Sequence, residues 1–585
     1  MGTRRLLLGL TPLLAVVALG CAGAQRPVTK IVNGRIIVTR PISPEAYEHV
    51  TRALLYEEEQ RWDEAAAELQ RALPFDDEAA EIRAHLAVLF VRAGRLDDAA
   101  EQIDRSFRIA PTVEGWLASA HLKQARGDSA GGIEARRRAV ALAIADEDVG
   151  AAERAYLELA EAQIATLDVT GAFETTRQLV RTTPDSVHAR VELASLAWAL
   201  GKLDDAEDGL RTALDHEPSD VDVRVMLAEV QVAAGKVAAA KTSFREAMDR
   251  SDSELVIAEA YVGWLVLRGD RAEAHELADR LTSEGGDGAS LEQMSRIERT
   301  VKRPDRAKAL AERALALGSA PGRVAILIGA ALDESGQRAA AVAKYLSVTA
   351  DAAEYVEARL RAAELLRDDG KTDEAAKIVD QVLATNPDSD SRVKLLITRS
   401  LIDEKRGDAA RAARRLDDAM TADGGNEDRL VLARAAIEDR RGDWRRALAL
   451  AQKLLDKDPQ NVEALNFCGF VAADHAHDLQ RATRQLQAAA ALSPGSGTIL
   501  DSLGWVYFRA GDLTNAGFFL EQSGRLEPGD PEILSHLGDL YAKRLEVARA
   551  LETYRKALAL SPPERLGREL AERIRTLEAR NAAGR

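Results

Sequence analysis

Apolar and small residues recur along this chain with a period close to 34 residues, most clearly from Gly497 to Pro562. Within each period, two stretches carry apolar residues three or four positions apart, which is the spacing of one helix face. A glycine separates the two stretches, as Gly511 does, and a proline such as Pro528 follows the second stretch. Each period therefore predicts two antiparallel helices joined by a tight turn.

A small residue recurs at the twentieth place of each period, where the two predicted helices cross. These residues are Ala65, Ala99, Gly132, Ala172, Ala206, Ala240, Ala274, Ala307, Ala341, Ala375, Ala412, Ala447, Ala482, Ala516 and Ala550. The pattern resembles the tetratricopeptide repeat (TPR). The resemblance implies an all-α fold, a right-handed α-solenoid of about fifteen helix-turn-helix units.

The repeats suggest an organisation into two arrays. We predict an N-terminal array over residues 46–283, a Gly-rich joint over 284–290 and a C-terminal array over 291–562. Residues 563–585 are predicted to hold a capping helix and a tail, because Leu566, Leu570, Ile574 and Leu577 form one apolar face backed by charges.

The first twenty residues have the composition of a secretory signal, with Arg4 and Arg5 before a short apolar run. The run ends at Ala18-Leu19-Gly20-Cys21, which resembles the bacterial lipobox, although Ala18 stands where that motif usually has a larger aliphatic residue. The resemblance implies lipidation of Cys21 and, because Ala22 follows, an anchor on the periplasmic face of the outer membrane. A plain secreted protein is the alternative.

Residues 21–45 are predicted to form a basic tether. Two β-branched runs flank Asn33-Gly34, which is the strongest short signal for a β-hairpin. Two interpretations stay open: an ordered hairpin that packs on the first repeat, or a docking strand for a partner.

Charge and composition narrow the classes of function. The net charge of −16 argues against nucleic-acid binding, even though the chain before Glu45 has six basic and no acidic residues. No phosphate-binding loop, nucleophile elbow or paired-cysteine motif is present, so we expect no catalytic residue, metal, cofactor or small-molecule substrate. Cys468 occupies a core place of its unit and is predicted to be a buried apolar residue.

The stretches Leu465–Phe470, Asp501–Tyr507 and His536–Asp539 go beyond the generic repeat. They resemble outer-membrane TPR lipoproteins of Gram-negative bacteria, including the lipoprotein adaptor of a periplasmic carboxyl-terminal processing protease. The resemblance implies a non-enzymatic scaffold whose partners are a periplasmic protease and cell-wall hydrolases. Similar motifs occur in lipoproteins of exopolysaccharide export, so assembly of an export machinery is the alternative function.

The same stretches contain the predicted partner-binding residues. In the TPR fold the first helix of each pair lines the concave face, and the side chains expected there are Phe470, Asp501, Trp505, Phe508 and Arg509. A groove with Trp, Phe and Arg has the composition of an interaction hot spot. The alternative is that these aromatic residues pack between neighbouring first helices.

Overall fold

The protein, described here from a computed structural model, is built almost entirely of short antiparallel helices. The structure describes residues 28–32, 35–39, 43–251, 254–283, 285–422 and 428–583. It divides into two compact units: residues 1–162 with 181–183, and residues 163–180 with 184–585. The division falls at α8 (Val149–Ala165) and α9 (Val169–Thr182).

The first unit contains one hairpin and three complete helix pairs. Strand β1 (Val28–Val32) pairs antiparallel with β2 (Arg35–Thr39), and Val32 lies opposite Arg35, so the predicted hairpin is confirmed although Asn33-Gly34 lies outside the described residues. The helix pairs are α2 (Pro44–Glu58) with α3 (Trp62–Ala72), α4 (Ala80–Arg92) with α5 (Leu96–Ile109), and α6 (Val113–Ala125) with α7 (Ser129–Ala145).

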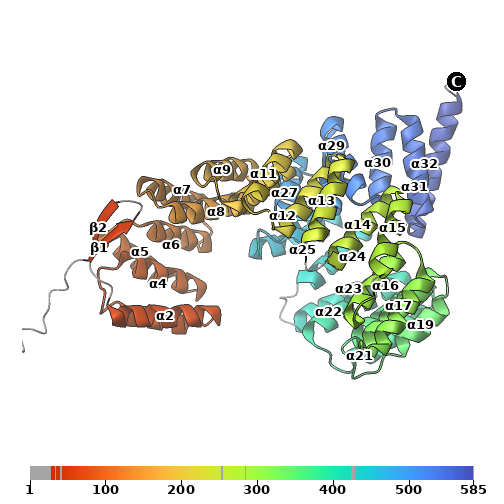
Figure 1. The fold of residues 1–585 in the computed structure, drawn as a ribbon, viewed down its shortest axis with the longest axis horizontal. Helices are drawn as coiled ribbons and strands as arrows, with labels where there is room; N and C mark the ends of the chain where they lie inside the picture. The colour runs from red at the N-terminus through yellow and green to blue at the C-terminus, as the bar shows by residue number, and fades with distance from the viewer. Residues whose placement is uncertain are drawn as a thin grey trace, which may run out of the picture. The chain divides into compact units, whose positions relative to one another are not determined.

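In the second unit, after α9, eleven further pairs follow in the same order, and Figure 1 shows them as a continuous succession of short helices. They are α10 (Val187–Ala199) with α11 (Leu203–His216), α12 (Val221–Ala233) with α13 (Val237–Arg250), α14 (Glu254–Arg268) with α15 (Arg271–Ser283), α16 (Gly288–Thr300) with α17 (Pro304–Ala316), α18 (Pro321–Glu334) with α19 (Arg338–Leu346), α20 (Tyr355–Asp368) with α21 (Thr372–Leu383), α22 (Ser389–Lys405) with α23 (Ala409–Ala422), α24 (Asp428–Arg440) with α25 (Trp444–Lys457), α26 (Val462–Asp474) with α27 (Leu479–Leu492), α28 (Gly497–Ala510) with α29 (Leu513–Leu526), and α30 (Pro531–Lys543) with α31 (Val547–Ala559). With the α8 and α9 segments, the described chain has the fifteen predicted pairs.

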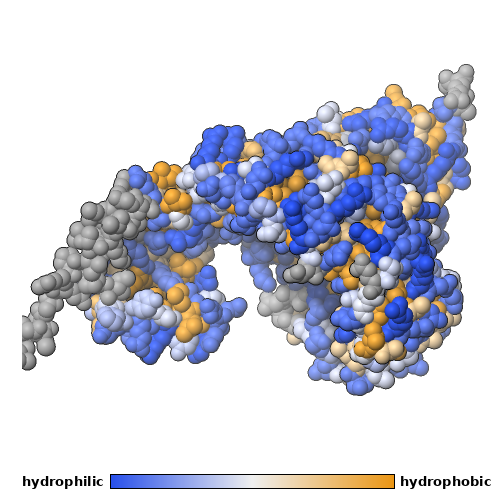
Figure 2. Space-filling view, in the orientation of Figure 1, coloured by the Kyte–Doolittle hydropathy of each residue, from blue (hydrophilic) through white to orange (hydrophobic). Residues whose placement is uncertain are grey.

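The small residues at the helix crossings are buried as the repeat pattern predicts. Every alanine at the twentieth place is 0 % exposed, from Ala65 to Ala550, and Gly132 is buried as well. The apolar core is therefore a succession of thin clusters, each shared by neighbouring pairs. Figure 2 agrees with this arrangement, because the visible face is mostly hydrophilic, with hydrophobic residues scattered over it.

The ends of the helices follow local chemistry. Many first helices begin at capping side chains, as where Ser496 Oγ accepts from the Ile499 backbone N–H at 3.4 Å. They end at a left-handed residue such as Gly511, with φ 83°. The last helix, α32 (Glu564–Ala583), covers the open end of the final pair and buries Leu570 completely, as predicted for a capping helix.

The predicted joint at 284–290 covers the connection between α15 and α16 and the first three residues of α16. Gly285 to Asp287 connect the two helices, and Asp287 caps α16 by accepting from the Ser290 backbone N–H at 2.8 Å. Both sides of this segment belong to the second compact unit. Whether it separates two arrays stays a prediction.

Within the second unit, helices far apart in sequence pack together. First helix α10 lies against second helix α27, and α12 lies against α29; we call these two contacts the seam (Figure 1 labels α12, α27 and α29). Trp198 Nε1 donates to Gln522 Oε1 at 3.1 Å, and Arg525 Nε donates to the backbone oxygen of Ala233 at 2.9 Å. A Cβ added to Gly201 would lie 2.8 Å from Phe518 Cε1, so the approach there is very close.

Candidate protein-binding site

The five predicted binding residues lie on two neighbouring first helices of the second unit. Phe470 is on α26, and Asp501, Trp505, Phe508 and Arg509 are on α28, which packs against α26 on one side and α30 on the other. Positions 501, 505 and 508 are one helical turn apart, so they share one face. The helix order thus brings the predicted residues to one place.

Close packing behind that face depends on the small residue of α28. A Cβ added to Gly504 would lie 2.6 Å from Leu520 Cγ and 2.9 Å from the Leu520 backbone nitrogen of α29. No larger residue fits without separating the two backbones. Gly504 therefore sets the position of the neighbouring Trp505.

At the centre of the predicted residues is a histidine of α30. The rings of Trp505 and His536 stack with centroids 4.2 Å apart, and Phe470 lies 6.2 Å from His536 at a tilt of 40°. Trp505 also stacks on Phe508 at 4.9 Å, and the Arg509 guanidinium lies 5.8 Å from the indole centroid. We call Phe470, Asp501, Trp505, Phe508, Arg509 and His536 the aromatic–histidine cluster.

The histidine is held in place by a carboxylate. His536 Nδ1 lies 2.7 Å from Asp501 Oδ2. Burial lowers the pKa of His536, but the interaction with Asp501, with smaller contributions from Asp539 and Glu532, outweighs burial and raises that pKa above its ordinary value of 6.5. The pair thus ties α28 to α30 through a hydrogen bond that gains strength when the imidazole is protonated.

Some buried polar atoms of the cluster are unsatisfied. Within the described part of the chain, Asp501 Oδ1 and Trp505 Nε1 have no hydrogen-bond partner, and neither does Asn466 Oδ1 on α26. An unpaired buried polar atom costs roughly 1–3 kcal/mol. The buried base of the cluster therefore holds one donor and two acceptors that lack a partner within the described residues.

The cluster has a buried base and a more accessible rim. Trp505 is 8 % exposed and Asp501 5 %, so the indole packs between neighbouring first helices. Phe470, Phe508 and Arg509 are half-buried, and Arg509 donates to the backbone oxygen and to Oδ1 of Asp474. The packing role of Trp505 is thus visible in the structure, while partner binding at this face stays a prediction.

Sequence reasoning missed His536 as a site residue. Its stretch carries the family resemblance, but the side chains expected on the concave face come from the second, fifth, ninth, twelfth and thirteenth places of a unit, and His536 is at the sixth place. A signal was available in the carboxylate of Asp501, which needs a donor from the next first helix once it is buried.

Two further predictions concern the cysteines. Cys468 is 3 % exposed, and burial raises the pKa of its thiol to about 12, so its predicted core role is confirmed. Cys21 lies outside the described residues, and its lipidation stays a prediction. Among the described helices, none has both the length and the apolar character needed to cross a bilayer.

Comparison with known proteins identifies the repeat. Tetratricopeptide repeat models match residues 50–114, 197–255 and 332–399, while no curated protein sequence matches the chain.

Several solved structures align with much of the chain at low identity. Naa15/Naa10 bound to HypK-THB covers 92 % of this chain and 97 % of that chain, at 13 % identity and a TM-score of 0.30. Yeast Tom70 covers 80 % of this chain and 96 % of that chain, at 14 % identity and a TM-score of 0.34. A thermophilic TPR protein from Thermus thermophilus covers 32 % of this chain and 99 % of that chain, at 21 % identity and a TM-score of 0.29. Because these TM-scores are below 0.5, they carry no argument, and the conclusion rests on the matched segments and the fifteen helix pairs: the chain contains tetratricopeptide repeats and has the α-solenoid fold.

Proposed function

We propose that this protein is a non-catalytic scaffold, anchored by lipid on Cys21 at the periplasmic face of the outer membrane, that recruits a partner protein through the aromatic–histidine cluster. The resemblance of residues 465–539 to protease-adaptor lipoproteins supports a role in delivering substrates to an envelope protease. The repeats themselves support protein binding, because each first helix presents one face that its own partner helix does not cover.

The observation that carries the proposal is the group of unsatisfied polar atoms beside half-buried aromatic rings. Asp501 Oδ1 and Trp505 Nε1 lack partners within the described residues, and Phe470 and Phe508 flank them. A partner segment with one polar group between apolar side chains would satisfy the orphan atoms and bury both rings. That combination is typical of an interface centre.

The test is affinity purification of the tagged full chain from native membranes, with mass spectrometry to identify the partner and rebinding of the purified partner. Phe470→Ala and Phe508→Ala remove half-buried rings, so we expect a loss of capture of about tenfold, the scale of a residue worth 1–2 kcal/mol, with a smaller drop in melting temperature than Trp505→Ala causes. Trp505→Ala removes a core indole and is expected to lower melting as well.

The matched control is Phe75→Ala, because Phe75 is a 50 % exposed aromatic residue in the first unit. Equal capture by the cluster variants and wild type would exclude the cluster as the binding site. The anchor has a separate test. If Cys21→Ala stays in the outer-membrane fraction after a salt wash, the lipid is not what holds the protein there.

A further inference from the structure

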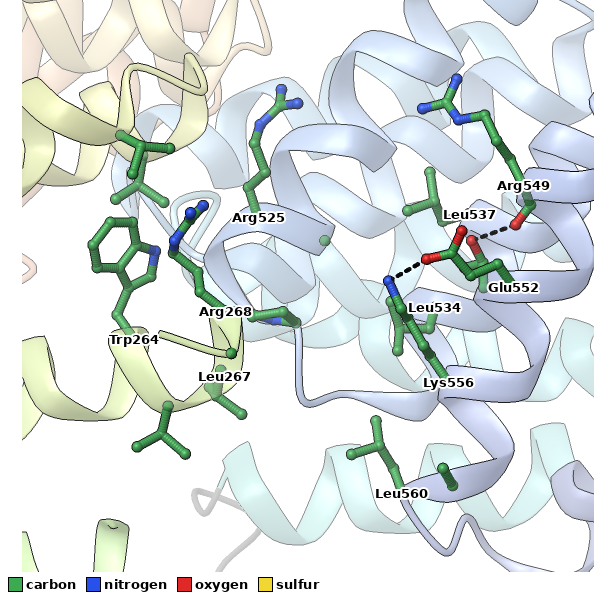
Figure 3. Close-up of a pocket in the computed structure, with 18 of the residues that line it drawn as sticks. Trp264, Leu267, Arg268, Arg525, Leu534, Leu537, Arg549, Glu552, Lys556 and Leu560 are labelled. Carbon is green, nitrogen blue, oxygen red and sulfur yellow. Dashed lines mark hydrogen bonds and ion pairs between the residues drawn. The ribbon is translucent and has the colours of Figure 1, made fainter. Parts of the chain in front are cut away.

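A second candidate surface lies beside the seam and shares helix α30 with the aromatic–histidine cluster. It is a cleft of about 630 Å³ between the α12–α15 segment and the α29–α31 segment (Figure 3). Each wall comes from a different part of the second unit, so the cleft exists only while those parts are packed together. It thus belongs to the folded superhelix and to no single repeat.

Both walls of the cleft carry apolar side chains. Trp264 and Leu267 of α14 stand on one side, and Leu534 and Leu537 of α30, with Leu560 after α31, stand on the other (Figure 3). Leu267 is 48 % exposed, so part of this apolar surface is open to solvent. The cleft can accept an apolar side chain.

The lining of the cleft is basic, in contrast to the net charge of −16. It has five basic side chains and one carboxylate, Glu552. The basic ones are Arg268, Arg271, Arg525, Arg549 and Lys556.

Several of these cations already have internal partners. Arg268 Nε donates to Asp270 at 3.3 Å, Lys556 pairs with Glu552 at 2.8 Å, and Arg549 pairs with Glu546 at 2.6 Å. The Lys556–Glu552 pair is exposed, the other two pairs are partly exposed, and Arg549 also donates to Tyr541 Oη at 2.8 Å; pairs open to solvent contribute little. They therefore leave their cations available to an incoming anion.

The remaining two cations are less well compensated. Arg525 Nε donates to the Ala233 carbonyl, and its nearest carboxylate oxygen, on Glu521, is 3.8 Å away. Burial lowers the pKa of Arg525 despite the opposing attraction of Glu521. Arg271 is exposed and has no ion-pair partner among the described residues. An incoming carboxylate would compensate both charges.

One buried donor of the cleft is also unsatisfied. Trp264 is 8 % exposed, and within the described chain its Nε1 donates to no acceptor. The indole stands beside the Arg268 guanidinium, whose central carbon is 5.1 Å from the ring centroid (Figure 3). An acceptor from a ligand in the cleft would satisfy this N–H group.

We propose that this cleft binds an acidic segment of a partner protein, with an apolar side chain seated between Trp264 and Leu534 and its carboxylates held by the surrounding cations. This proposal rests on the protein-binding role proposed above and gives it a second surface with a defined ligand chemistry. The protein's own N-terminal segment does not fit, because the chain before Glu45 has no acidic residue.

The test is fluorescence polarisation with the full chain and a short labelled peptide in which glutamates alternate with leucines. Two companion peptides, one with lysine for glutamate and one with alanine for leucine, separate the charge and apolar contributions. We expect the acidic–apolar peptide to bind most tightly and its affinity to fall as salt is raised. Absence of binding by this peptide at millimolar concentration would refute the proposal.

Charge reversal at the rim tests the location of binding. Arg271→Glu and Lys556→Glu change exposed side chains outside the seam contacts, and each should weaken the acidic peptide about tenfold, the equivalent of roughly 1.4 kcal/mol. Lys453→Glu is the matched control, since Lys453 is an exposed lysine of α25 outside the cleft. Equal effects of all three substitutions would show that only net charge matters and would overturn the site.

Trp264→Phe tests the buried donor, because it keeps an aromatic ring and removes the N–H group. We expect about fivefold weaker peptide binding with unchanged circular dichroism, on the scale of one hydrogen bond. Wild-type affinity in this variant would exclude the indole N–H as a ligand contact.

The two proposals fail separately. Phe470→Ala, at a ring of α26 that does not line the cleft, should leave peptide binding in the cleft unchanged, and failure of the peptide would leave partner capture by the aromatic–histidine cluster intact.

Discussion

At the scale of single residues, the turn between the two helices of a pair requires a left-handed backbone. Most units place glycine there, as at Gly511 with φ 83°, but the last pair has Leu545 with φ 64°. The side chain of Leu545 is 83 % exposed and makes no compensating core contact. A Cβ in this region costs roughly 1–2 kcal/mol.

Leu545→Gly is therefore expected to stabilise the α30–α31 pair. The strain energy that is relieved exceeds the free-energy cost of glycine's greater freedom in the unfolded chain. We therefore expect the free energy of opening this pair to rise by about 0.5–1 kcal/mol. Native-state hydrogen exchange of the amides in α30 and α31 measures this local opening free energy. Gly511→Leu, at the equivalent turn between α28 and α29, should lower the protection of the amides in those two helices. Faster exchange in Leu545→Gly would contradict the argument.

At Gly504 the constraint is steric, because there is no room for a side chain between α28 and α29. Gly504→Ala places a Cβ against both the side chain and the backbone of Leu520, and we expect a destabilisation of about 1–3 kcal/mol. Gly209→Ala in α11 is the control, because its nearest neighbour atom would lie 3.7 Å away and alanine favours a helix by about 1 kcal/mol. The melting temperature should fall in Gly504→Ala and rise in Gly209→Ala.

At the scale of elements, the aromatic–histidine cluster couples neighbouring first helices through one titratable pair. His536 of α30 and Asp501 of α28 are 2.7 Å apart, and the pKa of His536 is raised above 6.5. A raised pKa means that the folded state binds the proton more tightly than the unfolded state does. The stabilisation is fully present below pH 6.5 and is lost as the pH rises through the folded-state pKa.

Asp501→Asn is expected to reverse this shift. Burial alone lowers the pKa of a histidine, so the His536 value should drop once its carboxylate partner is gone. NMR titration of the imidazole carbon-bound protons measures both values in the full chain. A His536 pKa that is the same in wild type and Asp501→Asn would show that the carboxylate does not control it.

The elements themselves could be predicted from the sequence, because each pair depends on local patterns. Ala516 and Ala550 mark helix crossings, Gly511 marks a turn, and all three have those roles in the structure. The central place of His536 could not be read from the same pattern. Its contacts depend on how far α30 is rotated relative to α28, which the repeat spacing does not specify.

At the scale of the whole molecule, the seam is the feature that local patterns do not contain. Trp198 and Gln522 are 324 positions apart, and their hydrogen bond depends on small rotations accumulated over the intervening repeats. Glycine at positions 201 and 495 permits the close approach. A Cβ on Gly495 would lie 3.0 Å from the Trp198 ring and 3.1 Å from Glu229 Oε2.

Glu229 makes the seam sensitive to pH. Burial raises the pKa of its carboxyl group from 4.5 to about 7. Because an exposed glutamate would release its proton near pH 4.5, the packed seam binds more protons than the opened seam between these two values. Closure is therefore favoured most at low pH and loses stability as the pH rises from about 4.5 to about 7, by a total on the order of 3 kcal/mol.

Glu229→Gln should remove this pH dependence, since the amide keeps the shape and carries no charge. Hydrogen exchange of α10, α12, α27 and α29, compared between pH 5 and pH 8 after correction for intrinsic rates, reports opening of the seam. We expect wild-type protection to fall at the higher pH and Glu229→Gln protection to stay constant. Asp222→Asn, at an exposed carboxylate on the same helix, should behave as wild type. The same loss of protection in Glu229→Gln would mean that another group governs the seam.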